Sequence, residues 1–539
     1  MAIFDSTGNQ IDSKVAAEIS EVVWDMVAKA FQYSEDNLDN IDKNRSLMDF
    51  FREHLPEIVK DPKRRALVLQ EAHVWGSVIG DSISRQSLKC FFLEECIGGR
   101  MFGQARCYEA FSLIHLAEDT FVAKTYEKIL AEIAAMALSH ANIQFNEEVI
   151  FLDTPTSYEP NASSTPQTIV HTRSGKRQTF NEVVITAPLG WLKRNARKLF
   201  RKEAPLPPRL LRAIDNLGYG RLEKVYVAFP TSFWHASKDS RFTATFASSR
   251  SEASRAVSVP ASSTLLQSGA SIEYPFLTHF HNPKYIQHPS NVAWDQSMVN
   301  LAALPEPTAQ PTLLFYLYGD CGTHLLSLIS KERTATHAPQ TLSPPSSHAH
   351  HNKGDRTYSI LLSFFKPYYS RLPGYLDNKA ACQPSFFVTT NWQKDPCAGH
   401  GSYTNFPVGL ARGDRDIKVL RSGGVEQEAV KSPRTAKVDS SSPVANKDKS
   451  AASCGKDGRK TKIDTRSTPE NKANTDPPRN LGDIEASRGV GFTRGVWLSG
   501  EHTAPLIATG TTTGAYWSGE QAAARLLRLY GIDCKKYLT

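Results

Sequence analysis

A glycine- and threonine-rich segment near the C-terminus, WLSGEHTAPLIATGTTTGAYWSGE (497–520), carries the residues best suited to chemistry. Its pattern is typical of a strand end, a Gly-Glu turn, a loop and the start of a helix. Glycines admit close backbone approach, and the N–H groups of a helix N-terminus favour an anion or an electron-rich ring. The segment predicts one wall of a nucleotide-cofactor pocket, with candidate residues Gly500, Glu501, Gly510, Thr511 and Thr512. The alternative interpretation is a threonine-rich N-cap before a packing helix, with Glu501 as a capping acid.

A lysine lies in the middle of an apolar, alternating segment, LEKVYVAF (222–229). In a strand, Lys224 shares one face with Leu222, Tyr226 and Ala228. Burying an ammonium among such residues is costly and lowers its pKa, which is typical of lysines at functional sites. Lys224 is therefore a candidate catalytic residue. The alternative is a strand lysine whose ammonium extends to solvent.

Three further candidates come from strand-like segments elsewhere in the chain. Trp392 ends FFVTTNW (386–392), and Tyr403 lies in the sequence GSYTNF. An aromatic face suits a cationic amine, because the ring attracts positive charge. Val149 lies in the predicted strand NIQFNEEVIFLDT (142–154). All three residues also suit an ordinary hydrophobic core.

Helices dominate the N-terminal part of the chain. Residues 12–85 are rich in helical patterns, and SLMDFFREHL has Ser46 and Asp49 at capping-box spacing before an apolar stripe. TYEKILAEIAAMAL (125–138) has the periodicity of an amphipathic helix. Further on, TIVHTRSGKRQTFNEVVITAP (168–188) predicts a hairpin around SGK, and its last strand ends before a proline.

Strand-like segments return after residue 205, at 222–229, 312–319, 359–365, 386–392 and 495–500. At 539 residues the chain exceeds what one core usually serves. We therefore predict a mixed α/β (α+β) fold of two interleaved domains. Residues 1–90 and 205–385 would form a mixed-sheet and helical domain, and residues 118–200, 386–420 and 491–539 a nucleotide-binding layer.

The net charge of +8 does not indicate a nucleic-acid partner. Residues 421–490 hold fourteen Lys/Arg against ten Asp/Glu and contain no aromatic residue. Such a segment buries little apolar surface, so a disordered insertion is predicted there. Apolar stretches fall short of the roughly 18 residues of a membrane span, so no membrane partner is predicted.

Cysteine and histidine spacing predicts no metal site. The eight cysteines are scattered without a CxxC motif, which favours reduced thiols and a cytoplasmic location. His348, His350 and His351 fall in a Ser/Pro-rich stretch, SPPSSHAHHNKGD, and are interpreted as loop composition rather than metal ligands.

Six segments in order resemble the flavin-containing amine oxidases, most closely the fungal-type polyamine oxidases. The segments are NIQFNEEVIFLD, VVITAPLGWLK, LGYGRLEKVYVAF, FFKPYYSRLPGYL, WQKDPCAGHGSYTNFPVG and GEHTAPLIATGTTTGAYWSGE. The resemblance implies a two-domain enzyme with FAD, bound non-covalently, in the Rossmann-like layer. It implies oxidation of a small-molecule amine or polyamine to an imine, hydrolysis of the imine, and reoxidation by O2 to give H2O2.

The resemblance also implies a role for each candidate residue. Thr511 and Thr512 would contact the flavin pyrimidine ring, and Glu501 would lie near the ribityl–diphosphate region. The backbone of Val149 would meet the adenine. Lys224 would be bridged through water to flavin N5, where it assists imine hydrolysis or reoxidation. Trp392 would pack near the flavin, and Tyr403 would stand over its substrate side.

Several departures from the family pattern keep other interpretations open. No G-x-G-x-x-G turn is present, so we expect the segment that carries it, the first ninety or so residues of such an enzyme, to precede this sequence. The likeness of EECIGGRM (94–101) to the element that follows that turn is attributed to chance. Residues 98–117 interrupt the pattern as an insertion or a translated intron. The alternatives are a flavin-free relative that binds without turnover and a histone-lysine-demethylase-like oxidase; the oligomeric state stays open.

Overall fold

The structure is a computed structural model. It describes residues 1–98, 126–154, 167–202, 205–235, 274–286, 288, 294–335, 348–423, 495–504 and 508–532. The predicted disordered insertion lies outside these residues from 424 on, and so does the predicted interruption from residue 99 on. Among the described helices, none combines the length and the apolar content that crossing a membrane requires.

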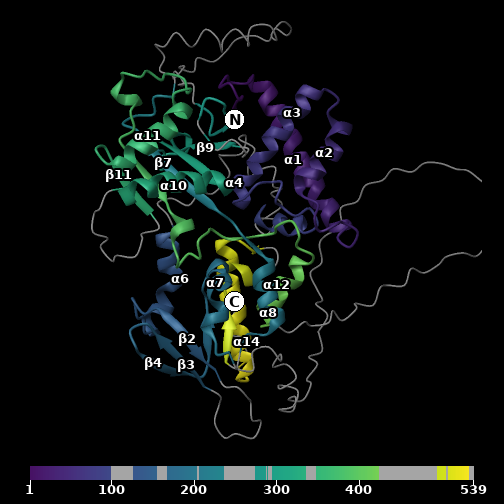
Figure 1. Cartoon of the computed structure of the whole chain (residues 1–539), viewed down its shortest axis with the longest axis vertical. Helices are drawn as coiled ribbons and strands as arrows, with labels where there is room; N and C mark the ends of the chain where they lie inside the picture. Colours follow the sequence, from purple (N-terminus) through teal and green to yellow (C-terminus); the bar gives the residue numbers. More distant parts are fainter. Residues whose placement is uncertain are drawn as a thin grey trace, which may run out of the picture.

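A mixed sheet forms the centre of one half of the molecule, at the upper left of Figure 1. Its described strands follow the spatial order β1-β8-β9-β10-β7-β12-β11. They are β1 (Ala2–Phe4), β7 (Leu222–Ala228), β8 (Leu277–Phe280), β9 (Gln296–Asn300), β10 (Thr312–Tyr318), β11 (His348–Asn352) and β12 (Phe386–Thr390). β1 pairs with β8 in parallel, and every other neighbouring pair is antiparallel. The strands predicted at 222–229, 312–319 and 386–392 are therefore confirmed.

Two predictions for this half are wrong. The segment 359–365 is not a strand but part of helix α11 (Arg356–Tyr369), which Asp355 caps by accepting from the Thr357 amide. Leu361, Phe365 and Tyr368 recur at helical spacing and face the core, so burial on one stripe decides the structure. The His348–His351 stretch is strand β11 rather than a loop, and its ladder with β12 explains why.

The N-terminal helices pack beside the sheet, at the upper right of Figure 1. They are α1 (Ser13–Asp36), α2 (Leu47–Ile58), α3 (Pro62–Glu71) and α4 (Gly76–Ile79), with the short η1 (Ala72–Trp75) between the last two. The predicted capping box is confirmed, because Ser46 accepts from the Asp49 amide while Asp49 accepts from the Ser46 amide. A separate apolar core, with Phe51 and Leu55 among its members, holds these helices together.

The second half of the molecule is built on smaller sheets, in the lower part of Figure 1. β5 (Val183–Ile185) pairs in parallel with β14 (Val496–Leu498), and β2 (Val149–Asp153), β3 (Thr168–Thr172) and β4 (Arg177–Phe180) form an antiparallel sheet. The β3–β4 hairpin confirms the prediction around SGK. The helices here are α6 (Glu127–His140), α7 (Leu189–Leu199), α8 (Pro208–Asn216), α12 (Gly413–Ser422) and α14 (Thr512–Leu529).

The chain passes between the two halves more than once, so the two domains are interleaved in sequence. The chain leaves the second half after α8, runs through the large sheet and returns at α12. β12 pairs with β7 in the large sheet, whereas the sequence prediction assigned residues 386–420 to the nucleotide-binding layer. The return to the second half therefore comes after β12. A short ladder between β6 (Gly218–Tyr219) and β13 (Thr404–Asn405) lies at this crossing.

Candidate active site

Lys224 lies in the middle of β7, directly opposite Tyr316 of β10. The ammonium Nζ lies 5.3 Å from the centre of the Tyr316 ring, close enough for a cation–π contact. Burial lowers the pKa of Lys224, because desolvation penalises the charged form. Lys224 shares its face with buried Leu222 and Ala228, as the alternating pattern predicts, and its catalytic role stays a prediction.

Tyr403 lies at the crossing between the two halves, where its carbonyl accepts from the Gly220 amide just before β7. Its hydroxyl donates to the carbonyl of Val78, which fixes the ring. Burial raises its pKa, and the charges of Glu94, Tyr316 and Glu501 raise it further. On the other side, a Cβ built on Gly510 would lie 3.8 Å from the Tyr403 ring. Tyr403 therefore connects the segment before β7 with the C-terminal glycine turn.

Glu501 holds that glycine turn in place through hydrogen bonds. Its carboxylate accepts from the Thr404 amide at 3.2 Å, from the Thr404 hydroxyl at 2.8 Å and from the Gly510 amide at 3.0 Å. Burial nevertheless outweighs these bonds and raises its pKa to about 7. Both oxygens are used within the protein, so the carboxylate fixes the turn that precedes α14. The expected role beside a ribityl–diphosphate remains a prediction.

The N-terminus of α14 has the geometry that the sequence predicts. Thr511 is its N-cap: the hydroxyl accepts from the Gly514 amide at 2.9 Å and donates to the Ala508 carbonyl at 2.7 Å. Gly510 has φ +79°, a conformation that glycine adopts without strain. Thr512 opens the first turn and is exposed. The helix therefore presents its positive end beside Tyr403.

Trp392 lies on the one-turn helix η6 (Trp392–Lys394), directly after β12. Its amide donates to the buried carboxylate of Glu223 at 3.1 Å. Since Glu223 and Lys224 are neighbours on β7, the turn that carries Trp392 is tied to the strand that carries the lysine.

Val149 lies apart from this group, at the start of β2, where it pairs with Thr172. Gly500, with φ +152°, lies two residues after the end of β14 and directly before the one-turn helix η7 (Glu501–Thr503).

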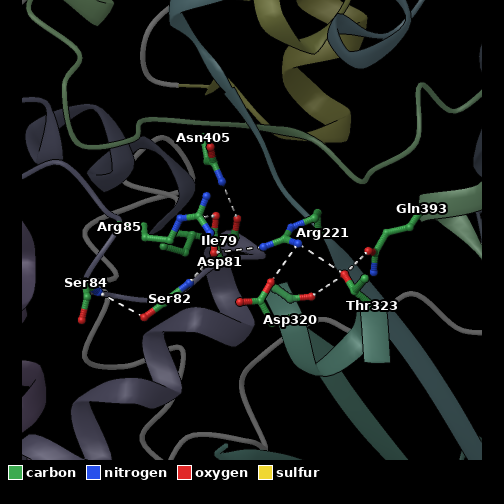
Figure 2. A network of polar contacts seen from close by, with 11 residues as sticks. Ile79, Asp81, Ser82, Ser84, Arg85, Arg221, Asp320, Thr323, Gln393 and Asn405 are labelled. Atoms are coloured by element: carbon green, nitrogen blue, oxygen red, sulfur yellow. Dashed lines mark hydrogen bonds and ion pairs between the residues drawn. The ribbon is translucent and has the colours of Figure 1, made fainter. Parts of the chain in front are cut away.

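A polar network anchors the start of β7 to its neighbours (Figure 2). The Arg221 guanidinium lies 3.0 Å from the Asp320 carboxylate and 3.8 Å from that of Asp81, and it donates to the Thr323 hydroxyl at 3.3 Å. Thr323 in turn donates to the Gln393 side chain at 2.6 Å. The network joins the segment just after α4 and the residue just before β7 to α10 (Gly319–Ala335) and η6. Its central residue, Arg221, lies three residues before Lys224.

The family model of flavin-containing amine oxidoreductases matches residues 10–285, which is just over half of the chain. The chain belongs to this family. The region matched includes Lys224 and the N-terminal helices. The mixed α/β architecture of the amine oxidoreductases agrees with the fold class predicted from the sequence.

Curated relatives match only short stretches of the chain. Histone demethylase-like protein A of Aspergillus fumigatus is 34% identical over 83 residues, 15% of this chain and 7% of that protein. A lysine-specific histone demethylase 1B homolog of Caenorhabditis elegans is 46% identical over 57 residues, 11% of this chain and 7% of that protein. The aligned part thus spans less than a tenth of these relatives.

A solved structure of a putrescine oxidase variant shares the fold. It aligns with a TM-score of 0.50 and 12% identity, and the alignment covers 98% of this chain and 81% of that chain. At this identity the likeness concerns the architecture alone. It agrees with the arrangement of a mixed sheet, flanking helices and a second, smaller-sheeted half.

The family implies a flavin, and the residues present suit the ring end of one. Gly510 and Thr511 would line the ring, since a left-handed glycine allows close approach, while their own amides donate to Glu501 and Ala508. The backbone N–H of Thr512 at the helix N-terminus would face the ring. His502, next to Glu501 in the chain, is wholly buried, and neither of its ring nitrogens makes a hydrogen bond.

Sequence reasoning missed Tyr316, Glu223 and Glu94. Tyr316 faces Lys224 only because of the β7–β10 register, which one sequence does not reveal. Glu223 is 1% exposed, and an acid inside an alternating apolar strand is itself a detectable signal, equal to that of Lys224. Glu94 lies in LEECIGG, where burial raises its pKa to about 8. Its electrostatic effect on Tyr403 is what makes Glu94 a candidate site residue.

Proposed function

We propose that the protein is an FAD-dependent amine oxidase of the polyamine oxidase type. A C–N single bond of a small-molecule amine is oxidised to an imine, water hydrolyses the imine to a carbonyl compound and a free amine, and O2 becomes H2O2. FAD, when bound, accepts the hydride from the carbon beside the nitrogen and passes the electrons to O2. The cysteines lie in no context typical of flavin attachment, which supports non-covalent binding.

Lys224 serves the hydrolytic step. Its lowered pKa leaves a larger neutral fraction at a given pH, and the neutral Nζ accepts a hydrogen bond from a water molecule. As that water attacks the imine carbon, Nζ takes its proton. The Tyr316 ring beneath Nζ restricts the rotamers of the lysine and stabilises the ammonium that results.

The aromatic rings and the helix N-terminus position the reactants. Tyr403 and Tyr316 offer faces to the cationic part of an amine, and their burial excludes water around the carbon that loses hydride. The Thr511 amide already donates to the Ala508 carbonyl, so the backbone N–H of Thr512, at the positive end of α14, is the one that stabilises negative charge on a cofactor ring placed against it. Glu501 holds the glycine turn that sets this distance.

The observation that carries the proposal is the position of Lys224, partly buried on β7 with its ammonium over the Tyr316 ring. Lys224→Met keeps the apolar stem and removes the amine, so we expect turnover to fall by roughly 10²–10⁴-fold while FAD still binds. Steady-state oxygen consumption with a diamine measures it. The matched control is Lys193→Met, because burial also lowers the pKa of Lys193, to about 8, on the distant helix α7. Unchanged turnover in Lys224→Met would show that this lysine only extends to solvent.

A second candidate function is oxidation of methylated lysine, because the curated relatives with local matches are named as histone demethylases. Two parallel assays separate the candidates: H2O2 release from free polyamines and demethylation of a methyl-lysine peptide. We expect turnover of the polyamine and none of the peptide. The opposite result would assign the protein to the demethylase type.

A flavin-free binding protein is the remaining interpretation, and the visible spectrum tests it. Protein purified with added FAD should keep the absorption bands of oxidised flavin through gel filtration. Acid precipitation should then release the flavin into the supernatant, as non-covalent binding requires. A colourless protein would favour the flavin-free interpretation.

A further inference from the structure

Glu223 and Lys224 are consecutive residues of β7 and point to opposite faces of the sheet. Lys224 faces the site, whereas Glu223 faces the junction with η6 and is 1% exposed. A buried carboxylate is costly unless hydrogen bonds compensate it, so its partners show what it does. The proposed mechanism assigns no role to this acid.

Three donors converge on the Glu223 carboxylate. All three come from the end of the neighbouring strand β12 and from η6, which follows it. The Thr390 hydroxyl donates at 2.5 Å, the Trp392 amide at 3.1 Å and the Gln393 amide at 2.8 Å. The same Thr390 oxygen accepts from the Lys224 amide at 2.8 Å. One carboxylate therefore fixes both the turn bearing Trp392 and, through Thr390, the backbone of Lys224.

A second contact holds the other side of this turn. Gln393 accepts from Thr323, which also accepts from Arg221, and Figure 2 shows Thr323 between the other two side chains. The groups packed against Glu223 are Thr390, Trp392 and Gln393, with Gly322 of α10, whose added Cβ would lie 3.5 Å from the Glu223 side chain. None of them carries a charge. The carboxylate acts through hydrogen bonds rather than through an ion pair.

We propose that Glu223 is a positioning residue, whose carboxylate sets the Trp392 indole at a fixed place relative to Lys224. A glutamine of the same shape cannot replace it. Its single carbonyl oxygen accepts from one amide, and its NH2 group confronts the other N–H. The role rests on the proposed function for its catalytic consequence, but the position of Trp392 is a property of the protein alone.

The first test is the exposure of Trp392 in protein without added flavin. Fluorescence quenching by acrylamide is measured for each variant with and without Trp392→Phe, so that the difference isolates Trp392 among the eight tryptophans. We expect Glu223→Gln and Thr390→Val to raise the quenching constant of Trp392 about twofold or more, because hydrogen bonds to charged groups are the stronger ones. The matched control is Thr389→Val, the same change on the neighbouring buried residue, whose hydroxyl contacts His351 instead.

The second test uses kinetics of the FAD-loaded protein. Misplacing a wall of the site slows turnover more than it weakens binding, so we expect Glu223→Gln to lower kcat roughly 10-fold or more with little change in KM. Thr389→Val should leave kcat unchanged. If no variant or wild-type protein turns over, the proposed function fails while the quenching test still decides the position of Trp392. An unchanged Trp392 signal in Glu223→Gln would overturn the positioning role and leave Glu223 as a structural residue.

Discussion

The two halves of the molecule differ in how completely they bury their apolar residues. Around the large sheet, Trp234, Trp294 and Phe365 lie wholly inside a continuous core. In the other half, helix α6 has no buried residue, with Leu130 65% and Met136 79% exposed. The amphipathic helix predicted at 125–138 is confirmed as a helix, but its apolar side faces outward.

We call the half with the large sheet the closed half and the half with α6 the open half. The small parallel sheet of the open half also leaves apolar residues exposed. β5 and β14 pair in parallel, yet Val184 of β5 is 42% exposed. Parallel sheets in proteins are covered on both faces, and sheets of two strands have little stability of their own. The site lies across the two halves: Lys224 and Tyr316 come from the closed half, whereas Glu501 and Thr511 come from the open one. The residues on the amine side of the site are therefore held in the better-packed half. The residues on the cofactor side should gain more stability from a bound ligand.

The largest effect on stability is expected in the closed half, at Glu71. Its buried carboxylate lies 2.7 Å from His279 and 2.6 Å from His281, and these bonds lower its pKa to about 2 against its burial, which acts in the opposite direction. Glu71→Gln should lower the free energy of unfolding by about 3–5 kcal/mol, because the glutamine carbonyl replaces one carboxylate oxygen while its NH2 group confronts the other buried histidine. Urea denaturation measures it, with Glu53→Gln at an exposed pair as control.

The pH dependence of stability follows from the same carboxylate. Its folded pKa lies below its ordinary value of 4.5, so the folded state holds the ionised form more strongly than the unfolded state does. The contribution is complete above about pH 4.5 and is lost as the pH falls towards 2. In Glu71→Gln this part of the acid-induced loss should disappear. Identical pH profiles of the two proteins would contradict the assignment.

Bound flavin should sharpen the difference between the halves. Ligand at a hundredfold excess over Kd stabilises the folded state by about 2.7 kcal/mol. We expect the slowing of amide hydrogen exchange to concentrate in β14 and the first turns of α14, and to be small in β9 and β10. Hydrogen-exchange mass spectrometry with and without FAD measures both. Equal protection of the two halves would break the comparison.

The smallest effect is expected for α6. Leu130→Ala removes a side chain that packs against little, so the free energy of unfolding should change by less than about 0.5 kcal/mol. The matched control is Leu361→Ala, the same substitution in the closed core, where about 2–5 kcal/mol is expected. Similar losses for both would mean that the apolar side of α6 is covered in solution.

Sequence reasoning could predict the elements whose signal is local. The alternation of LEKVYVAF predicts β7, and the Ser46–Asp49 spacing predicts the start of α2. SILLSFF misleads, because a short apolar run suits a strand and a buried helix equally until its packing is known. The pairing of Lys224 with Tyr316 and the convergence of Thr390 and Trp392 on Glu223 depend on strand register, which tertiary structure alone reveals.

The central claim is that this chain brings a flavin and an amine together beside Lys224. Anaerobic addition of a diamine to the FAD-loaded protein tests it most directly, with the visible absorption of the flavin as the readout. We predict that the absorption of oxidised flavin disappears on adding putrescine and returns when O2 is admitted, with release of H2O2. A flavin that stays bound and oxidised with every amine, or no bound flavin at all, would contradict the claim.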